Sequence, residues 1–169
     1  METEPTFYTE LANAIPIIIG GLLAIIGGIM GQVLTHRLSA RRERNELLNT
    51  RIEAIVKALY AHSRWIEEKF DTMVFRIEDH NSPSPLDEAI MLKSLYFPEL
   101  HQEIVDVMAA QTPLVNFIWE QRIARKKDDA AWLQTFNRSP YNEAYKAHLS
   151  ALSAVTRKCR AIVESRLEK

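Results

Sequence analysis

The residues most often used for metal binding and acid–base catalysis occur in this chain without the spacing that such chemistry needs. Its histidines are His36, His62, His80, His101 and His148. A di-iron site in a helical bundle draws on Glu-x-x-His pairs, yet no Asp or Glu stands three positions before any of these histidines. A zinc site likewise needs several ligands at set spacings. The sequence therefore predicts no metal site, and we expect the histidines at the surface or at helix ends.

Motifs for nucleophilic catalysis and phosphate binding are also missing from the sequence. Cys159 is the single cysteine, which excludes an internal disulfide and a cysteine-rich zinc site and favours an inert core position. No glycine-rich loop follows Thr35, and no serine lies in a nucleophile elbow. We therefore expect a protein that is not an enzyme, binds no cofactor and has no evident small-molecule substrate.

Two clusters of basic residues remain as candidate binding sites. The first consists of Arg37, Arg41, Arg42 and Arg44, and the second of Arg122, Arg125, Lys126 and Lys127. The first predicts a topology anchor that contacts anionic lipid headgroups, at about 1 kcal/mol per residue near the surface. The second is followed by Asp128 and Asp129, a mixture typical of a solvated helix end, with a partner or lipid contact as the alternative. The net charge of −1 gives no support for nucleic-acid binding.

The first basic cluster follows a long segment without charge. The 25 residues from Leu11 to Thr35 include no Asp, Glu, Lys or Arg. A bilayer core requires about 20 mostly apolar residues at about 1.5 Å of rise each. The sequence therefore predicts a short extracytoplasmic tail at 1–10, a single transmembrane helix at 11–35 and a cytoplasmic domain at 36–169.

The charges on either side of this segment predict its orientation. The residues before it include Glu2, Glu4 and Glu10 but no Lys or Arg, whereas arginines follow it. Because basic residues stay on the cytoplasmic side, we expect a single-pass protein of the inner (plasma) membrane with its N-terminus outside and its C-terminus in the cytoplasm. A cleaved signal peptide is disfavoured, since it would have a basic n-region and a shorter apolar core. A buried helix of a soluble protein is disfavoured because the segment is apolar on all sides.

The distribution of glycine and the helical spacing of apolar residues predict an all-α fold. All five glycines lie between positions 20 and 31, and a sheet protein would need more of them at turns and bulges. Apolar residues recur at steps of three and four between proline-containing breaks. The expected cytoplasmic helices cover about 36–80, 85–95, 98–136 with a kink near 113, and 140–167. Short connections favour an antiparallel three- or four-helix bundle.

Helix ends and core positions are also predicted. Ser84 and Ser139 are expected to cap the helices that follow them, with a proline in each first turn. The expected core of the last two helices is Leu100, Ile104, Val107, Met108, Leu114, Phe117, Ile118, Ile123, Tyr145, Leu149, Leu152, Val155, Cys159, Ile162 and Val163. The aromatic residues Tyr96, Phe97, Trp119 and Trp132 are expected in the core as well, with a docking groove for another protein's helix as the alternative.

Small residues in the apolar segment form a candidate packing face. Gly20, Ala24, Gly27 and Gly31 share one side of a helix, and Gly27 and Gly31 form a G-x-x-x-G pair. Small residues let two helices approach closely in lipid, which predicts a homo-oligomer. The same spacing continues through Leu34, Leu38, Arg41, Asn45, Leu48, Ile52 and Val56, which is compatible with one continuous coiled coil. Against this, Arg41 and Asn45 would weaken a coiled-coil seam, and the stripe would also suit packing within its own bundle.

Three functions are compatible with these features. The leading hypothesis is a membrane-tethered helical interaction or assembly module that self-associates or recruits an unknown cytoplasmic protein. The second is a membrane-acting effector whose glycine-rich span oligomerises and perturbs the bilayer. The third is a periplasmic coiled-coil linker of opposite topology, which the arginines after the span disfavour.

Overall fold

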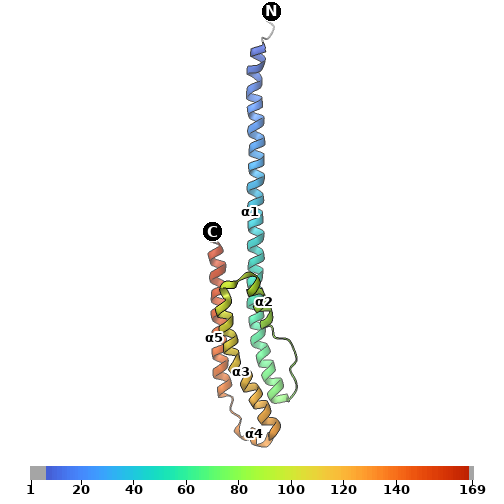
Figure 1. The fold of residues 1–169 in the computed structure, drawn as a ribbon, viewed down its shortest axis with the longest axis vertical. Coiled ribbons are helices and arrows are strands. Elements are labelled where there is room, and N and C mark those ends of the chain that lie inside the picture. Colours follow the sequence, from blue (N-terminus) through green and yellow to red (C-terminus); the bar gives the residue numbers. More distant parts are fainter. Residues whose placement is uncertain (1–6, 168–169) are drawn as a thin grey trace, which may run out of the picture. The chain divides into compact units, whose positions relative to one another are not determined.

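The computed structural model describes residues 7–167 as a set of helices joined by short connections (Figure 1). The helical elements are α1 (Phe7–Phe70), the π-helical turn η1 (Asp71–Arg76), α2 (Leu86–Tyr96), the 3-10 turn η2 (Pro98–Leu100), α3 (His101–Lys127), α4 (Asp129–Thr135) and α5 (Ser139–Leu167). Within residues 7–167 there is no strand. The prediction of an all-α fold is therefore confirmed.

The chain divides into two units between Glu46 and Leu47. The first unit, residues 1–46, contains the apolar segment, and the tail at 1–6 lies outside the described residues. The second unit, residues 47–169, contains the last part of α1 and all the other elements.

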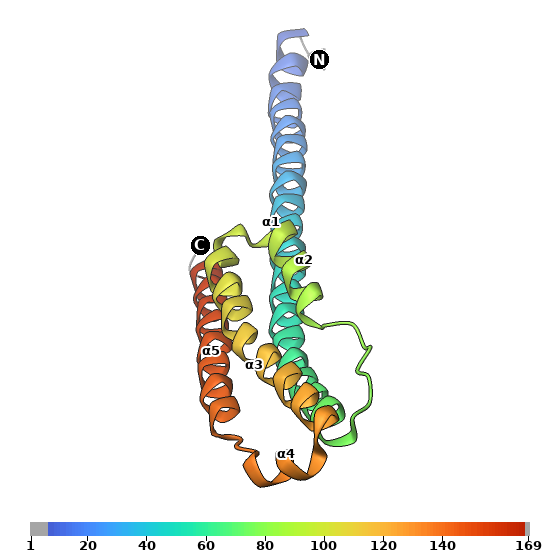
Figure 2. The same cartoon turned by 60° about the horizontal axis from the view of Figure 1, so that its bottom comes forward.

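The second unit is built around two apolar clusters that follow one another along its helices. Both clusters take side chains from the last part of α1, from α3 and from α5. The first core consists of Ile52, Ile55, Ala58, Leu59, Leu86, Ala89, Leu92, Phe97, Leu100, Ile104, Val107, Leu152, Val155 and Cys159. The second core consists of Ile66, Phe70, Met73, Val74, Leu114, Phe117, Ile118, Trp132 and Tyr141. Figures 1 and 2 show α3 and α5 side by side, with α4 in the turn that joins them.

The break predicted around the two prolines between Asn81 and Pro85 is present. Residues 77–85, which we call the strap, have no helical assignment and join η1 to α2 (Figure 2). At the start of α2 the Ser84 hydroxyl accepts a hydrogen bond from the Leu86 backbone N–H at 3.2 Å. Ser84 thus bonds the first backbone N–H of α2, but the N-cap position belongs to Pro85 and not to Ser84 as predicted.

The predicted helix over 98–136 differs from the observed one. Pro113 lies inside α3, which continues through it, so the helix is not split there; a break that was not predicted comes at Asp128. Burial of Val107 and Leu114 on either side of the proline holds α3 in place. At the break the Asp128 carboxylate accepts a hydrogen bond from the Ala131 N–H at 3.0 Å, which starts α4 as a new helix.

Two further sequence predictions need correction. Ser139 is the first residue of α5 and does not cap it; its backbone N–H donates to the side-chain oxygen of Asn137 at 2.9 Å. Met108, Ile123 and Leu149 are exposed, although helical spacing placed them in the core, and Trp119, which was also expected there, is 46% exposed. For these exposed residues, the apolar stripe read from the sequence is wider than the helix surface that neighbouring helices cover.

Candidate functional site

The first candidate site is the apolar surface of α1 in the first unit. Leu23 is 64% exposed and Met30 is 68% exposed, and the other apolar side chains described between Ile19 and Leu38 are similarly uncovered. This helix is long and apolar enough to cross a membrane, and none of its most apolar window is buried. By length and composition a signal sequence passes the same test. Soluble proteins rarely leave an apolar surface of this size in water, which makes this helix a candidate membrane span or interaction surface.

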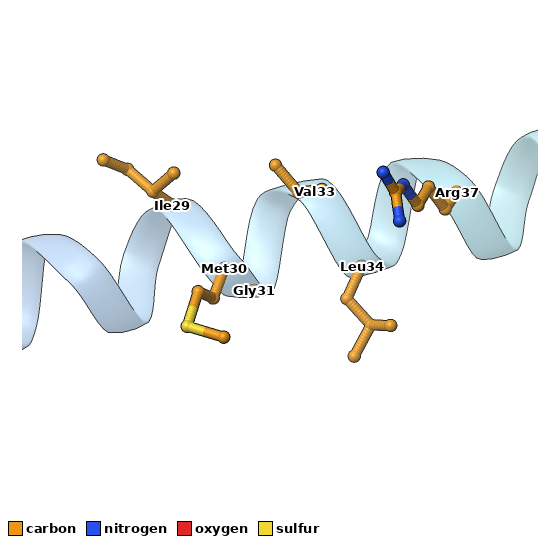
Figure 3. A pocket seen from close by; sticks show the side chains of 6 residues that line it. All are labelled: Ile29, Met30, Gly31, Val33, Leu34 and Arg37. Atoms are coloured by element: carbon orange, nitrogen blue, oxygen red, sulfur yellow. The ribbon is translucent and has the colours of Figure 1, made fainter.

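The predicted small-residue face is open in the described part of the chain. A Cβ atom added at Gly20, Gly27 or Gly31 would meet no atom within 4 Å beyond its own helical surroundings. Figure 3 shows the helix around Gly31, with Ile29 and Val33 leaving on one side. The nearby Thr35 hydroxyl donates to the Gly31 carbonyl at 2.8 Å, so this polar group is satisfied within the helix. The face is thus accessible for close helix packing, and its use by a second copy stays a prediction.

The first basic cluster is exposed along α1. Arg37, Arg41, Arg42 and Arg44 all present exposed side chains. Arg42 forms an ion pair with Glu46 at 2.9 Å, with both side chains largely in solvent. Such surface pairs contribute little to stability. The exposure of the cluster is what a contact with lipid headgroups requires.

The second basic cluster is only partly the solvated helix end that its sequence predicts, because its two arginines make contacts inside the second unit. Arg122 is buried and its Nη2 donates to the Asp79 carboxylate in the strap. Arg125 donates from Nη1 to the carbonyls of Val74 and Phe75, at 2.7 and 2.6 Å, where η1 ends. The two arginines therefore fasten this end of the second unit internally. Of the four predicted contact residues, Lys126 and Lys127 are the ones that remain exposed.

The second candidate site lies inside the second unit, between the two cores. We call it the polar layer, and its members are His62, Ser63, Gln111, Tyr145 and His148. His62 and His148 are both 0% exposed, so the expectation that the histidines lie at the surface or at helix ends is wrong for these two. Their rings meet edge to face with centroids 5.5 Å apart.

Hydrogen bonding inside the polar layer is incomplete. The Ser63 and Tyr145 hydroxyls are 2.8 Å apart and bond to each other, while His62 Nδ1 lies 3.2 Å from the Ser84 hydroxyl. His62 Nε2 and both ring nitrogens of His148 have no well-formed hydrogen bond to the described part of the chain. Buried polar atoms without hydrogen-bond partners are uncommon and cost free energy of folding. The polar layer therefore contributes less to stability than an equally buried apolar layer would.

The environment of the polar layer keeps both histidines neutral. Burial, together with the neighbouring His148, lowers the pKa of His62 to about 4, and Gln111 offsets this in part. Burial also lowers the pKa of His148, against a smaller opposing effect from the Val107 backbone. Burial is the first cause in both cases because the charged ring is poorly solvated away from water.

The polar layer does not have the make-up of a metal centre. In the range covered by the structure, no three His, Cys, Asp or Glu side chains come together in a way that could hold an ion. Cys159 lies in the first core, where burial and the nearby Glu103 raise the pKa of its thiol to about 11. A thiol with such a pKa is a poor nucleophile at neutral pH.

Sequence reasoning missed the buried histidines, although a signal was present. His62 lies between Leu59 and Ile66 at steps of three and four, and His148 lies in the same way between Tyr145 and Leu152. Both therefore occupy core positions of their helices. Comparisons with protein-family models, curated proteins and solved structures found no match for the chain.

Proposed function

We propose that the chain is a membrane-anchored helical interaction module. In this proposal residues 11–35 cross the inner (plasma) membrane once, with the N-terminal tail outside. Residues 36–169 then form a cytoplasmic helical bundle. The module self-associates through its span or recruits a cytoplasmic protein, and it has no catalytic role.

The exposed apolar surface of α1 carries this proposal. Side chains such as Leu23, Met30 and Leu34 are each more than 60% exposed, which lipid tolerates and water does not. The acidic residues before the segment and the exposed arginines after it favour a cytoplasmic C-terminus.

The small-residue face supports self-association. Gly20, Ala24, Gly27 and Gly31 form a stripe without large side chains, and lipid gives no hydrophobic drive for helix pairing, so close packing must supply it. A parallel homodimer would bury this stripe.

A reporter fused after Lys169 tests the topology. An enzyme active only in the cytoplasm should be active in this fusion, and an enzyme active only outside should be silent. The opposite pair of results would support the periplasmic linker and contradict the proposal.

Cysteine crosslinking tests self-association. A Cys159→Ala background removes the native thiol, and single cysteines at Gly27 and at Gly31 should then crosslink in membranes. Ile29→Cys is the matched control, since it lies on the opposite side of the helix, and it should crosslink poorly. Equal crosslinking at all three positions, or none, would contradict a specific face.

The effector hypothesis shares this surface but differs in outcome. Expression would collapse the membrane potential, and replacing Gly27 and Gly31 with Leu would prevent the collapse. An intact membrane potential with a crosslinked dimer supports the assembly module instead.

A further inference from the structure

The strap is fastened to the second unit at three successive places. At its start, Arg122 holds Asp79, and Ile77 adopts a left-handed conformation with φ of 60°. In the middle, the Trp65 indole N–H donates to the Ser82 carbonyl at 3.1 Å and to its hydroxyl at 2.9 Å. At its end, the Ser84 hydroxyl contacts His62. A β-branched residue is strained in the left-handed region, so these fastenings hold the strap against a local cost.

The contact between Ser84 and His62 depends on the protonation state of the ring. Ser84 Oγ already accepts the Leu86 N–H, so its hydroxyl proton is available to donate to His62 Nδ1. This arrangement needs a neutral ring that accepts at Nδ1, whereas a protonated ring carries hydrogen on both nitrogens and cannot accept. Protonation of His62 would place a hydrogen on Nδ1. The Nδ1–H and the Leu86 N–H would then both point at Ser84 Oγ, and the hydroxyl proton would lose its acceptor.

His80 repeats the arrangement at the surface of the strap. Ser82 Oγ accepts the Trp65 N–H and lies 2.7 Å from His80 Nε2. Trp65 in turn stacks on His62, with ring centroids 5.6 Å apart. His80 is only partly buried, so its ring has room to turn away, but His62 is enclosed and has no such freedom.

We propose that the strap over residues 77–85 is an acid-released latch, with the buried His62 ring as its trigger. When His62 takes up a proton, the Ser84 hydroxyl can no longer donate to the ring, and a charge without a compensating partner appears inside the polar layer. The strap then leaves α1, and the ring reaches water. The inference concerns the second unit and does not depend on the membrane proposal.

The groups around His62 favour this release. From α5, His148 faces the ring directly and would add a second positive charge if it were protonated too. From α3, Gln111 is neutral, and from the strap His80 touches Trp65. On α1 itself, the Lys69 ammonium lies 4.6 Å from the centroid of the Trp65 ring, and Glu67 contributes to raising the pKa of Tyr145. Among these groups around His62, none is a carboxylate that acts on its ring and would stabilise the protonated form.

Burial of the His62 ring sets the direction in which pH changes the stability of the closed strap. A folded-state pKa of about 4 against an ordinary value of 6.5 means that the closed strap binds fewer protons than the open one. The closed state is therefore unaffected above about pH 6.5 and loses stability as the pH falls towards 4. If the open ring regains its ordinary pKa, opening should be favoured about 30-fold at about pH 5 relative to pH 8.

Hydrogen exchange of the full chain in detergent tests the latch. The amides to follow are Glu78, Leu86 and Asp87, which are hydrogen-bonded at the two ends of the strap. After correction for intrinsic exchange, their protection should fall about 30-fold from about pH 8 to about pH 5, while amides of the first core keep theirs. Constant protection of the strap over this range would overturn the proposal.

Three substitutions identify the trigger. His62→Gln removes the titrating group and should reduce the acid effect to a few-fold at most. His80→Gln should leave most of it, and His101→Gln, at an exposed position away from the strap, should leave all of it. Acid release that survives His62→Gln, or that disappears only in His80→Gln, would overturn the assignment. If His62→Gln does not fold, an NMR titration of labelled histidine in the unchanged chain decides, because His62 must protonate over the same pH range in which the strap opens.

Discussion

The two units of this chain use the same secondary structure in opposite ways. In the first unit, α1 exposes large apolar side chains such as Leu23 and Met30. In the second unit, the same helix places Ile55, Leu59 and Ile66 at 1% exposure or less against other helices. Within the first unit nothing covers these apolar side chains, whereas the second unit buries its apolar side chains against its own helices.

Between Leu11 and Thr35 the first unit has no charged side chain, so that segment offers mainly apolar and small-residue surface. The second unit contains the polar groups that can respond to conditions, and it encloses the most sensitive of them between two apolar cores. Predictions that treat the two units differently therefore test the account.

The largest expected contrast comes from removing one large apolar side chain in each unit. Phe70 is fully buried and stacks on Tyr141 with ring centroids 4.3 Å apart. Phe70→Ala should lower the free energy of unfolding of the second unit by about 3–5 kcal/mol. Leu23→Ala should leave that free energy unchanged. Denaturant unfolding in one detergent, followed by tryptophan fluorescence, measures both, and equal losses would break the distinction between the units.

A smaller effect is expected from the basic residues at the end of α3. Arg122 is buried, holds Asp79 and lies over the Trp119 ring at 5.6 Å. Arg122→Ala should lower the free energy of unfolding by about 2 kcal/mol, since it removes a charged hydrogen bond and buried packing. Lys126→Ala and Lys127→Ala should leave the unfolding midpoint unchanged. A similar loss for either lysine would show that the cluster acts as one surface.

The smallest expected effect concerns single hydroxyl groups. Ser63→Ala and Tyr145→Phe each remove the 2.8 Å hydrogen bond in the polar layer and should each cost about 1 kcal/mol. The double variant should cost less than the sum, because both changes break the same bond. Thr35→Val removes a comparable hydroxyl in the first unit and should not change unfolding of the second. An additive double variant would show that the two hydroxyls contribute independently.

Predictions about the first unit rest on local sequence patterns, and its span and orientation stay predictions, whereas those about the second depend on how helices meet. Absence of charge over 11–35, with acid before and arginine after, is a local pattern that can be read without a fold. The break at the strap is likewise local, because proline and serine act on their immediate neighbours. The start of α4 at Asp128 was not predicted, because no proline or glycine marks the break there.

The polar layer was not predictable in the same way. His62, Gln111 and His148 are far apart in the sequence and meet only because three helices are in a particular register. The role of Arg122 and Arg125 was missed for a similar reason, since their acceptors are η1 and the strap, which lie about fifty residues earlier in the chain. Helical spacing shows that a residue faces inward, but it does not show which residue it meets.

Membrane fractionation of the full chain tests the central claim most directly. The account predicts that the chain stays in the membrane pellet after an alkaline wash and leaves it only with detergent. Leu23→Arg with Ile26→Arg should weaken insertion, at a cost of about 3 kcal/mol for each charge near the middle of a span. Recovery of the unchanged chain in the soluble fraction without detergent would contradict the account.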